Sequence, residues 1–323
     1  MSTLLILDRQ AVAQALPMHE CIEVMATALA DFARGTYRPF PRRALSDPRT
    51  PALMGLMPVF QDGDAPMWGL KDVLVSPANR ALGLDSHQGA MLVHDGRTGV
   101  LQALLDAGEL TAIRTAATSA VATRALARKD AARVAILGTG AQARSHIAAL
   151  RLVLPEAEFR LWGRSFGNAQ ALAASMQATA CEHVRDAVAD ADVVCTLTAS
   201  PTPLLQHDWL RPGCHINAVG ASRRDARELG SDVIAAAELF VDSREQALEE
   251  CGEVHLARAE GAIAADPIRG ELGQVLSGAC AGRSDNQALT VFKSLGLAVE
   301  DLAAAACAMR NAERMGIGQR VRW

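Results

Sequence analysis

The sequence lacks the features that mark several large classes of protein. It has no apolar stretch of the roughly 18 residues that a membrane-spanning helix needs, so no span is expected. It also has no long block of like charges, and its formal net charge is only −4. Such a balance gives no electrostatic footprint for nucleic acid or for an anionic membrane. We therefore expect a small molecule as the partner, with no nucleic acid and no membrane.

The patterns of metal sites and disulfide frameworks are missing as well. There is no Cys-x-x-Cys pair and no His-Glu-x-x-His sequence. Cys251 and His255 in "CGEVH" come nearest to a ligand spacing, but zinc needs further ligands. The seven cysteines are odd in number and widely spaced, which favours reduced thiols in a cytoplasmic protein. The N-terminal "MSTLLILDRQAVAQAL" lacks a basic leader and predicts a strand and a helix rather than a signal peptide.

What the chain does contain is a second half rich in short apolar runs. With 323 residues, half of them hydrophobic, the chain is long enough for two ordinary domains. From Arg133 onward helical stretches separate the runs "RVAILG", "EFRLWG", "DVVCTLT", "CHINAVGA" and "ELFVDS". Continuous apolar runs are typical of strands that crossover helices bury on both faces. This half therefore predicts an α/β fold with a Rossmann-type, doubly wound parallel sheet.

The first 110 or so residues have a different texture, with most of the prolines and many turn sequences. Alternation in "WGLKDVLVS" and "QGAMLVHDGRTGVLQALLD" predicts antiparallel strands, with "DGRTG" as a hairpin turn. Residues 110–128 predict a helix, and "GLAVEDLAAAACAMRNAERMGIG" predicts a long one that ends at Gly316. We expect one domain at 1–116, joined by a C-terminal helix at 304–323, and a second at 117–303.

A glycine motif follows the first apolar run of the second half. In "RVAILGTGAQA", Gly138 permits a tight turn, Gly140 lets a pyrophosphate approach the backbone, and Ala143 allows close helix–strand packing. Such turns also occur for packing reasons alone, but this one stands between an expected strand and an expected helix. The motif predicts a dinucleotide site at a helix N-terminus, with Ala141 and Gln142 among its contacts.

The end of the next strand bears on which dinucleotide is bound. An NAD site usually has an acidic residue there, whereas "FRLWGRS" offers Gly163, Arg164 and Ser165. Arg164 can form a charge-assisted fork on a 2′-phosphate, and Ser165 can donate one more hydrogen bond. We expect NADP(H) rather than NAD(H), which stays the alternative. The competing interpretation of Arg164 is a solvent-facing loop residue.

Several segments resemble the ornithine cyclodeaminase/mu-crystallin family over about residues 50 to 310. They are "LTAIRTAATSAVATRALA", "ILGTGAQARSH", "NAVGASRRDAREL", "VDSREQAL", "GELGQVLSG" and "TVFKSLGLAVEDLAAA". Some look nearer the mu-crystallin branch than the cyclodeaminases. The resemblance implies a Rossmann domain plus an N-terminal α+β domain for substrate binding and dimerisation, and hence a homodimer. It also implies hydride transfer at the carbon alpha to a carboxylate, through an imine.

The resemblance assigns roles to residues of the first half. Lys71 in "WGLKD" matches the pocket lysine, which can anchor a carboxylate and donate a proton. Without the family, an edge charge on a strand is the commoner role of such a lysine. The family's carboxylate-binding arginine matches Arg42 by spacing, or Arg43 if the register slips by one residue, and Arg114 matches a second family arginine. The competing interpretation of Arg114 is an ion pair at the head of the linking helix. Ser86 falls where the family has a small hydroxyl residue in the pocket.

Further cofactor contacts are expected after the strands of the second half and beside Arg114. These residues are Arg114, Thr115, Thr198, Val219, Ser222, Ser294 and Gly296. Ligands collect beyond the carboxyl ends of parallel strands, which supports the positions after strands. A serine or threonine at a strand end is, however, as often a helix cap.

One position departs from the cyclodeaminases. Counted back from the "EL" of "GASRRDAREL", their catalytic aspartate is replaced by Ser222, and Asp225 is out of register. Ornithine cyclisation needs a base that a serine alone does not supply. The resemblance and this departure favour NADPH-dependent reduction of cyclic or linear alpha-imino acids, such as pyrroline-2-carboxylate or piperideine-2-carboxylate. The alternatives are a family enzyme that cyclises ornithine or oxidises alanine, and an NADPH-dependent binding protein without turnover.

Overall fold

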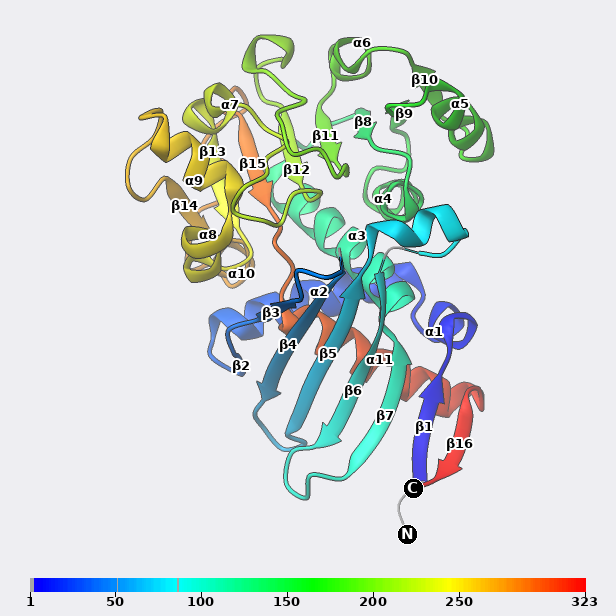
Figure 1. Ribbon diagram of the computed structural model, residues 1–323. Coiled ribbons are helices and arrows are strands. Elements are labelled where there is room, and N and C mark those ends of the chain that lie inside the picture. The colour runs from blue at the N-terminus through cyan, green and yellow to red at the C-terminus, as the bar shows by residue number, and fades with distance from the viewer. Residues whose placement is uncertain (1–2, 51, 86) are drawn as a thin grey trace. The chain divides into compact units, whose positions relative to one another are not determined.

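The computed structural model describes residues 3–50, 52–85 and 87–323, and the chain divides into two compact units (Figure 1). Unit 1 comprises Met1–Thr115 and Leu297–Trp323, and unit 2 comprises Ala116–Gly296. The second boundary falls seven residues before the expected one at 303/304. The expected boundary would cut the helix α11 (Ala298–Met315), which is continuous and packs on the sheet of unit 1 along its whole buried side.

Unit 1 is built on a sheet in the order β16-β1-β7-β6-β5-β4-β2, with β3 also paired to β4. Its strands are β1 (Thr3–Leu7), β2 (Tyr37–Pro39), β3 (Arg43–Ser46), β4 (Leu53–Gln61), β5 (Met67–Val75), β6 (His87–Asp95), β7 (Leu101–Asp106) and β16 (Gln319–Arg322). The pair β1–β7 is parallel and the other pairs are antiparallel. The expected hairpin turn joins β6 to β7: Asp95 Oδ1 accepts hydrogen bonds from the backbone of Arg97 and Thr98.

Helices cover one face of this sheet, namely α1 (Arg9–Ala15), α2 (Met18–Ala33) and α11. Figure 1 shows α11 behind strands β4 to β6. A Cβ at Gly69 on β5 would lie 3.0 Å from Leu302 Cδ1 of α11 and 2.7 Å from Met91 Cε, so glycine permits this close approach. As expected, α11 ends at Gly316, whose φ of 66° is left-handed. The short helix η1 (Pro77–Leu82) follows β5.

Unit 2 contains a wholly parallel sheet in the order β10-β9-β8-β11-β12-β15-β13-β14. The strands are β8 (Arg133–Leu137), β9 (Glu158–Trp162), β10 (Thr179–Cys181), β11 (Val193–Thr196), β12 (His215–Ala218), β13 (Glu238–Val241), β14 (Ile268–Glu271) and β15 (Thr290–Lys293). The predicted Rossmann-type, doubly wound sheet is confirmed.

Helices bury both faces of the unit 2 sheet. They are α3 (Ala107–Leu126), which begins in unit 1, α4 (Ala141–Val153), α5 (Phe166–Ser175), α6 (Val184–Val188), α7 (Ser231–Ala236), α8 (Arg244–Glu250), α9 (Gly252–Ala259), α10 (Leu272–Leu276) and the short η2 (His207–Trp209). Successive residues of β8 belong to different core clusters: Val134 and Ile136 to one, Ala135 and Leu137 to the other. Because side chains of a strand alternate between faces, burial on both sides explains the continuous apolar runs.

Two findings concern membranes and metals. Within residues 3–50, 52–85 and 87–323, no helix combines the length and the apolar character of a bilayer span. The same residues contain no group of three or more His, Cys, Asp or Glu side chains placed to hold a metal ion. All seven cysteines are free thiols.

Candidate active site

The candidate reactive group of unit 1 is a buried lysine in the middle of its sheet. Lys71 lies on β5, opposite Met57 of β4 and Met91 of β6, and is only 3% exposed. Its neighbouring strands flank it on both sides, so the interpretation as a charge at a sheet edge is wrong. An ammonium group in such an apolar layer requires a charged or hydrogen-bonding partner.

That partner is the acidic pair at the start of α11. Lys71 Nζ lies 2.7 Å from Asp301 Oδ2, while the other oxygen of this carboxylate accepts a hydrogen bond of 2.9 Å from Arg114 Nε. Arg114, on α3, also donates through Nη1 to Glu300 Oε2. The four side chains are at most 5% exposed. Two cations and two carboxylates thus form one buried cluster, and Arg114 is both a candidate substrate residue and an ion-pair partner.

The environment tunes the acidity of the lysine. Burial lowers the pKa of Lys71 to about 8; the Asp301 carboxylate opposes this shift, and the Arg114 guanidinium adds to it. An amine with a pKa near 8 is still mostly protonated at neutral pH but gives up its proton more readily than an ordinary lysine. The cluster therefore places an amine of lowered pKa beside a guanidinium.

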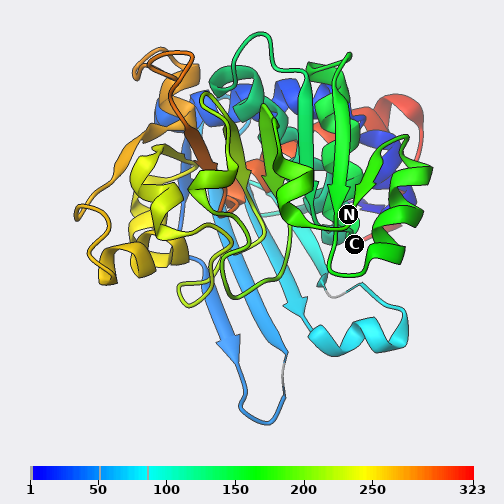
Figure 2. The same cartoon turned by 90° about the horizontal axis from the view of Figure 1, so that it is seen from above.

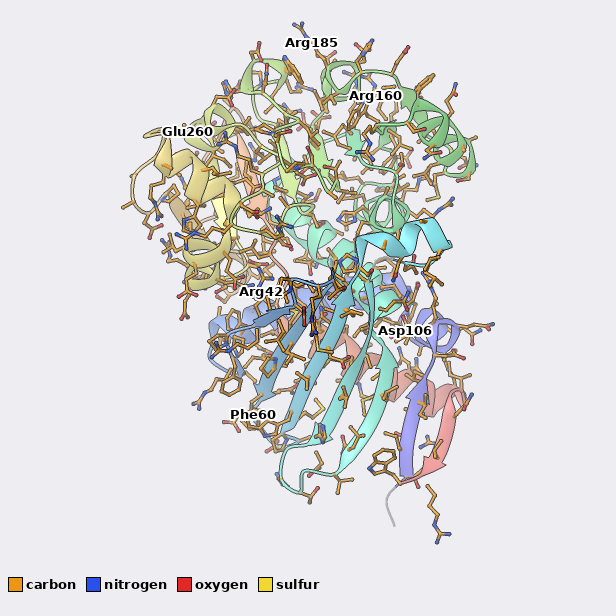
Figure 3. All side chains as sticks on the ribbon, in the orientation of Figure 1. Arg42, Phe60, Asp106, Arg160, Arg185 and Glu260 are labelled. Atoms are coloured by element: carbon orange, nitrogen blue, oxygen red, sulfur yellow. The ribbon has the colours of Figure 1, made fainter. Side chains whose placement is uncertain are left out.

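Arg42 and its alternative Arg43 lie at the start of β3. Arg42 immediately precedes this strand and is half-buried, and its side chain is labelled in Figure 3. Arg43 is the first residue of β3 and is exposed, opposite Leu56 of β4. Ser86 lies outside the described residues. Thr115, which follows Arg114 on α3, is 6% exposed.

Sequence reasoning missed Glu300 and Asp301. The pattern of "GLAVEDLAAAACAM" was interpreted only as a long helix. Two adjacent acidic residues within an otherwise apolar helix were the available signal, because buried carboxylates are rare unless they are paired.

A candidate cofactor site of unit 2 begins at the turn between β8 and α4. Gly138 has a φ of 138°, and a Cβ there would lie 2.7 Å from the carbonyl oxygen of Leu197. Gly140 is the N-cap of α4 and has no side-chain cap, and a Cβ on it would meet nothing within 4 Å. Ala143 is fully buried. The turn thus has the backbone amides and the open approach that a pyrophosphate needs, beside exposed Ala141 and half-buried Gln142.

The end of β9 is held against this turn. Gly138 donates its amide hydrogen to the Trp162 carbonyl over 2.8 Å, and a Cβ at Gly163 would lie 2.4 Å from Thr139 Cγ2. Arg164 follows and is exposed, and Ser165 caps α5 by accepting a hydrogen bond from the Asn168 amide. Because Gly163 has no side chain, the backbone just before Arg164 lies close to the turn between β8 and α4.

The residues predicted after β11 and β12 are tied to a buried glutamate. The Thr198 hydroxyl donates to Glu228 Oε1 at 2.6 Å, so it is directed at this carboxylate. The amide of Gly220 donates to Glu228 Oε2 at 2.8 Å. Val219 beside it is half-buried, whereas Ser222 is exposed.

A buried lysine also holds the loop that follows β12. Lys293, at the end of β15, donates to the Ala221 carbonyl and lies 3.2 Å from Glu253 Oε2. Burial disfavours its charge, but the carboxylates of Glu253 and Glu228 outweigh burial and the pKa of Lys293 is raised. This network was not predicted. Its signal was a lysine at the end of the apolar run "LTVFKSLG".

The segment after β15 is fixed in a similar way. Asp242 Oδ2 accepts the amides of Leu295 and Gly296 at 2.6 and 2.7 Å, and Gly296 has a φ of 79°. Ser294 is 3% exposed and its amide donates to the Ala218 carbonyl at 3.0 Å. The predicted cofactor residues of unit 2 thus lie on turns at the carboxyl ends of its parallel strands.

Known proteins are similar to this chain over most of its length. The mouse (Mus musculus) protein "Ketimine reductase mu-crystallin" is 40% identical over 291 residues, which cover 88% of this chain and 89% of the mouse protein. The structure of Thermococcus litoralis Delta(1)-pyrroline-2-carboxylate reductase in complex with NADH and L-proline is similar with a TM-score of 0.93 and 33% identity, covering 98% of this chain and all of that one.

An archaeal alanine dehydrogenase dimer with bound NAD is also similar, with a TM-score of 0.93 and 28% identity over the whole of both chains. The model of the ornithine cyclodeaminase/mu-crystallin family matches residues 3–315. The chain therefore belongs to the ornithine cyclodeaminase/mu-crystallin family.

Proposed function

We propose that the protein is an NADPH-dependent reductase of alpha-imino acids, which converts ketimines such as pyrroline-2-carboxylate or piperideine-2-carboxylate to amino acids. Its similarity to a ketimine reductase and to a pyrroline-2-carboxylate reductase supports this. The observation that carries the proposal is the buried cluster of Lys71, Asp301 and Arg114. It combines a proton donor with an anion-binding guanidinium, and imine reduction requires both.

In the mechanism, a bound nicotinamide supplies the hydride that adds to the imine carbon. Lys71 donates its proton to the imine nitrogen, which receives the electron pair of the broken C=N π bond. Arg42 and Arg114 bind the substrate carboxylate and orient the carbon. Lys71 then takes a proton from solvent. One hydride and one proton are consumed, and the products are the amino acid and the oxidised cofactor.

The proposed residues for the cofactor lie on the turns of unit 2. The amides after Gly138 and Gly140 would bind the pyrophosphate, and Thr198, Val219, Ser222 and Ser294 on the neighbouring turns would contact the rest of the cofactor. Arg164 and Ser165 would bind a 2′-phosphate, and the end of β9 carries no acidic residue for a ribose hydroxyl. These features favour NADP(H), although both similar structures contain NAD or NADH.

The deaminating alternatives lack their base. Ser222 is exposed, and Asp225 pairs with Arg223 over 2.6 Å on the surface, where the two side chains are about seventy per cent exposed (69% and 72%). Asp225 is thus turned to a neighbouring arginine and does not replace the missing acid. A binding protein without turnover would have no need for a buried amine of lowered pKa.

The protein is further proposed to be a homodimer. The sheet face opposite α11 exposes a set of large apolar side chains, namely Met54, Trp68 and Leu74 at 37–42%. Trp68 stacks on Phe40 with ring centroids 5.5 Å apart, and Phe60 lies beside it on the same face (Figure 3). Figure 2 shows the helix η1 on the side of the sheet away from α2. Such a face is typical of a subunit interface, and the similar alanine dehydrogenase is a dimer.

The protein is also proposed to be cytoplasmic, and the free thiols of its seven cysteines fit this location.

The function is tested by measuring NADPH oxidation on a panel of cyclic and linear imino acids, together with ammonia release from ornithine and alanine oxidation. We expect the fastest turnover with an imino acid and little ammonia from ornithine. Faster ammonia release than imine reduction would replace the proposal with a cyclodeaminase. NADPH binding with no turnover on the whole panel would identify a binding protein.

A further inference from the structure

Asp301 is shared between two cations. One carboxylate oxygen lies 2.7 Å from Lys71 Nζ, and the other accepts a hydrogen bond of 2.9 Å from Arg114 Nε. The Asp301 side chain is completely buried. Because both oxygens are in use, the place of the amine and the place of the guanidinium depend on the same rigid group.

We propose that Asp301 is the positioning residue of the reaction: its carboxylate holds the proton donor Lys71 and the carboxylate anchor Arg114 at a fixed separation. The inference rests on the proposed function. The imine nitrogen that takes the proton is two bonds from the carbon of the substrate carboxylate, so the proton donor and the anchor must be spaced to match this short distance. A shared carboxylate fixes such a spacing better than two separate partners would, because neither cation can move without breaking the same bridge.

The fold places Asp301 for this role. Glu300 and Asp301 lie in the first turn of α11, on the helix that packs against β5, the strand of Lys71. Their negative charge suits the N-terminal end of a helix. Asp301 contacts both cations, whereas Glu300 forms an ion pair with Arg114. The two adjacent acids therefore differ in their contact with Lys71, and substitutions of each can be compared.

The charges that face Lys71 come from two helices, α11 and α3. Asp301 and Glu300 on α11 favour the protonated amine, while Arg114 on α3 and the burial of β5 disfavour it. The buried Cys21 of α2 lies in the field of Arg114 and Glu300, and burial raises the pKa of its thiol, so it stays neutral. Of the two acids, Asp301 has the larger influence on Lys71.

A pH dependence follows from this arrangement. Lys71 acts as an acid when it is protonated, so turnover falls as the pH rises through its pKa of about 8. Removing the Asp301 charge removes the largest influence that keeps the proton on the amine. The pKa of Lys71 then falls further, and the alkaline limb of the pH profile moves to lower pH.

The test compares Asp301→Asn with Glu300→Gln, using the full-length protein, NADPH and the best imino acid. For Asp301→Asn we expect the alkaline limb of kcat to shift toward acid by about one pH unit or more, as for the loss of an adjacent opposite charge. For Glu300→Gln we expect a higher KM for the imino acid and a much smaller shift. Equal shifts in both variants, or none in Asp301→Asn, would overturn the proposal.

A second variant covers the case in which Asp301→Asn does not fold. Asp301→Glu keeps the charge but lengthens the side chain, so it should lower kcat at least about tenfold without moving the alkaline limb. Unchanged kcat in Asp301→Glu would show that the spacing is unimportant. If the unmodified protein reduces no imino acid, the proposed function fails; if it does and the variants behave as the unmodified protein, only this inference fails.

Discussion

At the scale of single residues, the chemistry of unit 1 depends on an amine that is buried yet still charged. Lys71 is 3% exposed, and Asp301 and Arg114 act on its pKa in opposite directions. The resemblance to a family was sufficient to single out Lys71 and Arg114. It gave no reason to choose Asp301 or Glu300, because helical periodicity indicates which residues form a helix but not which of them pair with a distant strand.

The proton donor is tested by Lys71→Ala. We expect turnover to fall at least about a hundredfold, as for loss of a positioned general acid, while the binding of NADPH survives. Stopped-flow turnover and NADPH fluorescence titration measure the two effects. Ser222→Ala is the matched control and should do much less harm, because the exposed serine has no obligatory proton transfer. Similar losses in both variants would contradict the assignment.

The choice of cofactor is tested by Arg164→Ala. A lost charge-assisted contact to a phosphate costs about 1.5–3 kcal/mol, so KM for NADPH should rise about ten- to a hundredfold. KM for NADH should hardly change, because NADH has no 2′-phosphate. Arg185→Ala, at an exposed arginine on α6, is the control and should leave both values unchanged. Equal weakening toward both cofactors would show that Arg164 has another role.

At the scale of elements, the apolar runs were sufficient to predict β8, β9, β11, β12 and β13. They succeeded because helices bury both faces of these strands. The strand β15 was not predicted. Its last residue is a lysine, and the partner that allows this charge to be buried, Glu253, lies forty positions earlier in the sequence. The domain boundary at 303/304 was expected too late in the chain, because α11 already begins at Ala298 and sequence alone does not show which sheet this helix covers.

The support of the loop after β12 is tested by Lys293→Met. This change leaves the buried Glu253 carboxylate without its cation, and breaking a buried ion pair costs about 3–5 kcal/mol. Urea denaturation should show a loss of this order in the free energy of unfolding. The control is Arg223→Ala, which removes a solvent-exposed pair with Asp225 and should hardly change the free energy of unfolding. Equal and small losses would mean that the Lys293 pair does not hold the loop.

At the scale of the whole molecule, the sheet of unit 1 is unusual in having apolar side chains on both faces. One face packs on α11, and the other exposes Met54 and Leu74, which lie directly opposite each other on β4 and β5. Alternation in the sequence indicated strands but did not reveal this second face. Association of two chains through this face would bury its apolar side chains, which is favourable, and the surface therefore favours the proposed dimer.

The dimer is tested by Leu74→Arg, which places a charge on the uncovered face. The unmodified protein should scatter light as a dimer, and the variant as a monomer, because a buried unpaired charge opposes association. Leu74 is 42% exposed in the single chain, so the change should not disturb its fold. Leu152→Arg, at a leucine of α4 that is 52% exposed, is the control and should stay dimeric. An unmodified protein that is monomeric and fully active would contradict the proposed dimer. A Leu74→Arg variant that stays dimeric would show that the interface lies elsewhere.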